Sequence, residues 1–97
     1  MNAQQQQQAA WTAARALVNQ CALSDLEAVD STEAHGQWGR KGWPSITRAG
    51  NAFIDFCEGY GGDVLVQMTD DNGECDELES ANPLQAAWTL LRRNLGE

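Results

Sequence analysis

The sequence predicts an α+β fold: a mostly helical small single domain with a short antiparallel β-hairpin packed against helices. Apolar residues recur at helical spacing near both ends of the chain, and strict alternation begins after Gly61-Gly62. The turn sequence Asp70-Asp71-Asn72-Gly73 divides the alternating part into two strands. A chain of 97 residues has the size of one domain, so we expect a single domain over 1–97.

The first element is predicted to be a helix that ends near Cys21. Ala10, Ala14, Leu17 and Cys21 follow one another at spacings of four, three and four, which places them on one helical face. The glutamine run at 4–8 extends this helix at its amino end. Low-complexity polar segments at a terminus are poorly held, so residues 1–8 are expected to be frayed or disordered.

A short second helix is predicted over residues 25–33. Ser24-Asp25-Leu26-Glu27 has the pattern of a capping box, a hydroxyl side chain answered by a carboxylate three residues later. Leu26 and Val29 would be buried by this helix, and its outer face would be acidic.

A loop and a third helix are predicted next. Residues 35–44 contain three glycines and Pro44, which break any regular period. Ser45 would then cap a helix that runs to about Glu58 and ends at Gly59. Its buried face would carry Ile46, Ala49, Phe53, Ile54 and Cys57.

The last third is predicted to be a hairpin followed by a helix. Val64, Val66 and Met68 alternate with polar or outward residues, and a second strand is expected over 74–79. Asn82 and Pro83 are typical of the N-cap and first position of a helix. The helix would bury Leu84, Ala87, Trp88, Leu91 and Leu95.

The stretch from Gly62 to the end, with its Asp-Asn-Gly turn and the run Asn82-Pro83-Leu84-Gln85-Ala86-Ala87-Trp88, resembles small phage and prophage domains of the ABA-sandwich kind. The resemblance covers about a third of the chain and implies a phage-like origin rather than an activity. In size and charge the chain is also similar to small acidic phage proteins that antagonise host defence. These include anti-CRISPR proteins that imitate DNA.

The charge balance is strongly acidic. Six Lys and Arg residues stand against fourteen Asp and Glu, which gives a net charge of −8. This balance argues against a polybasic nucleic-acid binder and favours a basic partner. No apolar run is long enough to span a membrane and no secretory signal is present, so a cytoplasmic location is expected, that of the host cell if the chain is phage-encoded.

The most unusual segment carries six carboxylates in ten residues and no basic residue. Strand rise is about 3.3 Å per residue and phosphates of one DNA strand repeat every ~3.4 Å of axis, so an acidic strand would match that charge density. A second acidic segment precedes the loop. The predicted partner-contacting carboxylates are Asp70, Asp71, Glu74, Asp76, Glu77 and Glu79, with Asp25, Glu27, Asp30 and Glu33 as a secondary set.

Two alternative functions remain open. The loop Trp38-Gly39-Arg40-Lys41-Gly42-Trp43 combines aromatic and cationic side chains that are typical of binding anchors, which suggests a small regulatory or assembly module that is recognised through Trp38 and Trp43. Alternatively, Gly73 fits the sixth position of an EF-hand loop, with Asp70, Asn72, Asp76 and Glu79 as calcium ligands. Met68 would fall at the first ligand position and cannot bind calcium, so no metal or other cofactor is expected.

No catalytic signature is present. His35 is the one histidine, and the three cysteines (Cys21, Cys57 and Cys75) lack the spacing of a zinc site or a disulfide framework. The sequence therefore predicts a non-enzymatic inhibitor, a monomer or dimer. Its acidic surface would block a basic nucleic-acid groove on a larger host protein or ribonucleoprotein complex without binding nucleic acid or membrane itself.

Overall fold

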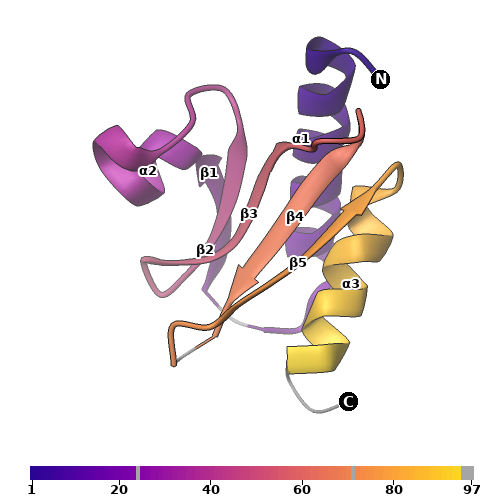
Figure 1. Cartoon of the computed structure of the whole chain (residues 1–97). Coiled ribbons are helices and arrows are strands. Elements are labelled where there is room, and N and C mark those ends of the chain that lie inside the picture. The colour runs from indigo at the N-terminus through magenta and orange to yellow at the C-terminus, as the bar shows by residue number, and fades with distance from the viewer. Residues whose placement is uncertain (24, 71, 95–97) are drawn as a thin grey trace.

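The computed structural model describes residues 1–23, 25–70 and 72–94 (Figure 1). These described residues form three helices, a short 3-10 turn and five strands. In chain order they are α1 (Ala3–Gln20), β1 (Leu26–Asp30), α2 (Ser31–His35), a 3-10 turn (Gly36–Trp38), β2 (Pro44–Arg48), β3 (Asn51–Glu58), β4 (Val64–Thr69), β5 (Cys75–Ser80) and α3 (Pro83–Asn94).

The five strands form one antiparallel meander in the order β1-β2-β3-β4-β5, so β1 and β5 are its two edges. Helices α1 and α3 contact each other and both pack against the sheet, α1 behind β1 to β4 and α3 against β4 and β5 (Figure 1). The short helix α2 contacts β1, β2 and β3. Since the two long helices share one face, the opposite face is open except where α2 lies over it.

The hydrophobic core lies between the sheet and the two long helices. Alternate strand residues point into it, and paired positions such as Ile54 and Met68 meet across neighbouring strands. Helix α1 contributes small residues and Leu17, while α3 contributes Leu90 and Leu91. The largest fully buried side chain is Phe56 at the centre of the sheet. Alanines on α1 allow the helix to approach the sheet closely, which suits a core with few large apolar residues.

The predicted fold class is wrong in its proportion of helix to strand. The chain is not mostly helical with one short hairpin but carries a five-stranded sheet. The helix predicted over 25–33 is largely β1, a strand at Leu26–Asp30, with only Ser31–His35 helical. Ser24 of the predicted capping box lies outside the described residues. Glu27 belongs to a strand because pairing with β2 supplies backbone hydrogen bonds that local capping would otherwise provide.

The helix predicted over 45–58 is also wrong, since this segment is the β2–β3 hairpin. Its turn lies at Ala49 and Gly50, which both have positive φ, at 52° and 84°. Two positive φ angles suit the tight turn of a hairpin, which glycine adopts readily and alanine rarely. Gly50 therefore lies in the turn between β2 and β3, where the sequence predicted the interior of a helix.

The remaining elements are confirmed. Helix α1, the β4–β5 hairpin and α3 occupy the predicted segments within a residue or two. Within residues 1–8, α1 begins at Ala3 with an Asn2–Gln5 capping box. Gln6 is buried, and its amide Nε2 donates to the carbonyl of Gly62 at 2.8 Å. A glutamine of the polar run thus attaches the start of α1 to the β3–β4 loop.

Candidate functional site

The two acidic segments lie at opposite edges of the sheet. Glu27 is on β1, whereas Glu74, Glu77 and Glu79 are on or beside β5, with three strands between them. Neighbouring strands are about 4.8 Å apart, so the two edges are separated by roughly 19 Å. The secondary set therefore does not extend the β5 set into one continuous line.

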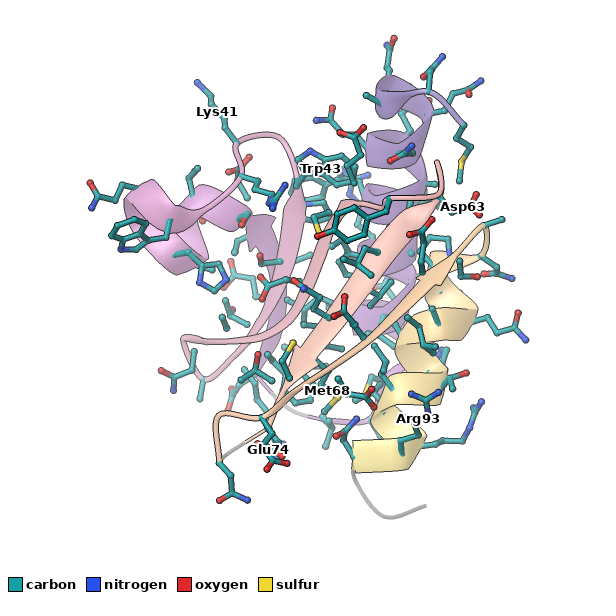
Figure 2. All side chains as sticks on the ribbon, viewed as in Figure 1. Lys41, Trp43, Asp63, Met68, Glu74 and Arg93 are labelled. Atoms are coloured by element: carbon teal, nitrogen blue, oxygen red, sulfur yellow. The ribbon has the colours of Figure 1, made fainter. Side chains whose placement is uncertain are left out.

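Side chains of β5 alternate between the two faces of the sheet. Glu77 and Glu79 face the open side, while Asp76 faces the helices. Asp76 receives hydrogen bonds from Asn94 Nδ2 at 3.2 Å and from Arg93, whose guanidinium also forms an ion pair with it (Figure 2). The Asn94 hydrogen bond is the main reason that the pKa of Asp76 is lowered. This carboxylate holds the end of α3 against β5.

Two more of the predicted carboxylates have structural roles. Asp70 Oδ1 accepts the backbone N–H groups of Asn72 and Glu74, both at 2.9 Å, and so closes the β4–β5 turn. Glu79 Oε2 accepts the N–H of Gly61 at 2.7 Å, although its side chain is exposed. Glu74, at the end of the hairpin in Figure 2, and Glu77 are exposed. Asp71 lies outside the described residues.

In the secondary set, Asp30 is the N-cap of α2. Its Oδ1 accepts from the backbone N–H and the hydroxyl of Thr32, and its Oδ2 accepts from the N–H of Gly42 at 2.8 Å. These hydrogen bonds, the Thr32 hydroxyl first, lower the pKa of Asp30. Asp25, Glu27 and Glu33 are exposed, and Asp25 has a positive φ of 63°.

The tryptophan loop divides into a buried and an exposed part. Trp43 is buried at 7% exposure, while Trp38 on the 3-10 turn is 83% exposed. The loop is fixed at Gly42, whose carbonyl accepts from Trp11 Nε1 at 2.8 Å. Lys41 projects into solvent beside it (Figure 2). Of the two predicted aromatic anchors, only Trp38 is available to a partner.

The calcium alternative receives no support from the geometry. The segment around Gly73 joins two strands, whereas an EF-hand loop joins two helices, and Asp76 points to α3. Within the described residues, no group of three or more His, Cys, Asp or Glu side chains is placed to hold a metal ion. The cysteines in that part of the chain are free, with Cys57 buried and Cys75 exposed.

The structure also reveals a polar cluster that sequence reasoning missed. His35 Nε2 contacts Asp55 Oδ1 at 2.7 Å, and the fully buried Ser45 hydroxyl donates to the same oxygen. These residues come from α2, β3 and β2, and His35 and Asp55 line a cavity under α2. The signal for this cluster in the sequence is Asp55, a polar residue between apolar neighbours. The sequence does not show which residues meet Asp55, because that depends on the fold, including the strand register that pairs it with Ser45.

The cluster does not have the arrangement of a nucleophile and its base. Ser45 and His35 both bond to Asp55 rather than to each other, so the serine hydroxyl has no imidazole to accept its proton. Cys57, which lines the same cavity, has a pKa raised by burial. A protonated thiol is a weak nucleophile.

No protein-family model, curated protein or solved structure matches this chain. In the described part of the chain, no helix has the length and apolar character to cross a bilayer.

Proposed function

We propose that this chain is a non-enzymatic inhibitor that binds the basic nucleic-acid groove of a larger protein or ribonucleoprotein through the acidic edge of its sheet. The observation that carries the proposal is the pair Glu74 and Glu77 at the β5 edge. Both side chains are exposed, and neither forms an ion pair with any described residue. The ion pairs among the described residues are His35–Asp55 and Arg93–Asp76. Carboxylates left without cations attract a cationic surface and speed its approach.

The spacing of these charges sets the kind of contact. Only alternate residues of β5 face the open side, so Glu77 and Glu79 repeat at about 6.7 Å, twice the rise per residue of a strand. This is half the linear charge density of one DNA strand, which carries a phosphate every ~3.4 Å of axis. The edge therefore fits separate Lys or Arg side chains rather than imitating a continuous phosphate backbone. The phage resemblance suggests an RNA-guided complex as the partner.

The test compares two variants with the same change of net charge. Glu74→Gln with Glu77→Gln removes the free charges of the β5 edge, and Glu27→Gln with Glu33→Gln removes two exposed charges at the opposite edge. Each variant is immobilised, and the proteins that it retains are eluted with duplex DNA. We expect the β5 variant to lose at least about tenfold of the DNA-eluted protein, and the β1-side variant to retain it.

Equal loss in both variants, or elution that DNA does not promote, would overturn the proposal. A second candidate is favoured by the 83% exposure of Trp38, which is a potential apolar anchor. In that case Trp38→Ala would abolish retention while the β5 variant would keep it, and raised salt would have little effect.

A further inference from the structure

The cavity under α2 has walls from five segments of the chain. It holds about 280 Å³ and opens on the uncovered face of the sheet. The side chains that matter for binding are those of His35, Trp38, Arg40, Asp55, Cys57 and Gln67. Apart from Trp38 and Arg40, which are exposed, these residues are buried or half-buried.

Asp55 and Gln67 are direct cross-strand partners in the β3–β4 register, so their side chains lie side by side at the floor of the cavity. Asp55 Oδ1 is used by His35 and Ser45, whereas no described residue donates to Asp55 Oδ2. The side-chain amide of Gln67 likewise forms no hydrogen bond with any described residue. The pair therefore offers one acceptor and one adjacent donor to a ligand.

Trp38 and Arg40 stand above this floor. An indole that is 83% exposed presents a flat apolar face on which a planar ring would stack. Arg40 forms no ion pair with any described carboxylate, and it lines the cavity together with Cys57. Unpaired guanidinium groups bind phosphate and carboxylate through two parallel N–H donors.

We propose that this cavity binds a nucleoside monophosphate. The base stacks on Trp38, a ring N–H donates to Asp55 Oδ2, and the adjacent base carbonyl accepts from Gln67. The phosphate is received by Arg40. Trp38, Arg40, Asp55 and Gln67 all line the same cavity, so the base and the phosphate would be held within one site.

This inference does not rest on the proposed function, because it uses no residue of the β5 edge. The test is a titration of the full-length 15N-labelled chain with uridine 5′-monophosphate, followed by amide and indole N–H signals. We expect saturable shifts of the Trp38 indole and the Gln67 side-chain amide. Uridine, which lacks the phosphate, and 3-methyluridine 5′-monophosphate, which lacks the ring donor, should each bind at least about tenfold more weakly.

Exposed side chains allow variants that keep the fold. Arg40→Gln should weaken binding of the monophosphate at least about tenfold and leave uridine within about twofold, because only the phosphate contact is removed. Trp38→Ala should weaken both ligands. Lys41→Gln is the matched control, since Lys41 is a neighbouring exposed cation outside the cavity lining, and it should change either affinity by less than about threefold.

Absence of saturation up to about 10 mM of the monophosphate, which corresponds to binding weaker than most specific ligands, would overturn the proposal. Equal effects of Arg40→Gln and Lys41→Gln would overturn it too, because they would indicate attraction to net charge. Undiminished binding of 3-methyluridine 5′-monophosphate would refute the assigned contact to Asp55.

Discussion

Asp30 is expected to stabilise the fold through three hydrogen bonds. Two of them cap α2, and the third joins α2 to the tryptophan loop. One carboxylate oxygen caps α2 through Thr32, and the other accepts the N–H of Gly42 at 2.8 Å. Gly42 in turn receives Trp11 of α1 on its carbonyl. Removal of this carboxylate would remove the hydrogen bond between Asp30 and Gly42, while the Ser31 N–H would still donate to the Trp43 carbonyl at 2.7 Å.

The expected cost of removing the Asp30 carboxylate follows from the hydrogen bonds that it accepts. Replacement of an N-cap Asp by Ala costs about 1 kcal/mol, and the Gly42 hydrogen bond adds about 1 kcal/mol, since Asp30 is half-buried. Asp30→Ala should therefore lower the free energy of unfolding by about 2 kcal/mol. Asp30→Asn keeps an oxygen for Thr32 but turns an N–H₂ toward Gly42, so the free energy of unfolding should fall by about 1 kcal/mol.

The effect should depend on pH. Hydrogen bonds to the ionised form lower the pKa of Asp30 in the folded state below its ordinary value. Its stabilising contribution is therefore fully present above the unfolded pKa of about 3.9, and it is lost as the pH falls through the folded value. The difference between wild type and Asp30→Asn should shrink below about pH 4.

Urea denaturation followed by circular dichroism measures both effects. With a slope near 1 kcal/mol per M for a domain of this size, Asp30→Ala should shift the midpoint by about 2 M. Glu33→Ala on the exposed side of α2 is the control, and its free energy of unfolding should change by less than about 0.5 kcal/mol. Midpoints for Asp30→Ala and Glu33→Ala that agree within error would refute the assigned role.

Three further predictions concern packing, loop geometry and thiol reactivity. Phe56→Ala should cost about 3–5 kcal/mol and abolish most of the cooperative thermal transition, because Phe56 is the largest fully buried side chain. Gly61→Ala should cost no more than about 1 kcal/mol, because the atom 2.5 Å from the added Cβ is the end of the exposed Glu79 side chain, which can move at the loss of its hydrogen bond to Gly61; Glu79→Ala should remove that cost in a double-mutant cycle. In alkylation followed by mass spectrometry, exposed Cys75 should react at least about tenfold faster than Cys57, because the Cys57 thiol is buried; equal rates would contradict the buried placement.

The success of sequence reasoning depended on whether a segment's structure is decided locally. Helix α3 has an N-cap, a proline and an apolar stripe of its own, and all three agree. The 45–58 segment is different, since Ile46, Phe53 and Ile54 satisfy helical spacing while Ile54 and Phe56 satisfy strand alternation. The deciding feature is the positive φ of Ala49, and alanine gives no signal of such a turn.

The candidate sites show the same limit. The acidity of β5 was evident from the sequence, but the structural roles of Asp76 and Glu79 depend on α3 and Gly61, which only the fold brings near. The cavity residues His35, Asp55 and Gln67 are separated by up to 32 positions; Asp55 and Gln67 meet through strand register, and His35 reaches Asp55 because α2 packs over the sheet. A sequence pattern predicts charge and alternation, whereas register is set by the whole sheet.

The two proposed sites adjoin each other, and this fixes the sign of their coupling. Glu77 is the register partner of Gln67, which in turn is the partner of Asp55, so the β5 edge borders the floor of the cavity. Because the Glu77 carboxylate lies beside both sites, it repels a phosphate bound in the cavity and attracts a basic partner at the β5 edge. Glu77→Gln should therefore weaken binding of the basic partner while it leaves uridine monophosphate binding unchanged or strengthens it by up to about threefold. A variant that weakened both would mean that Glu77 acts through the fold of the sheet rather than through its charge.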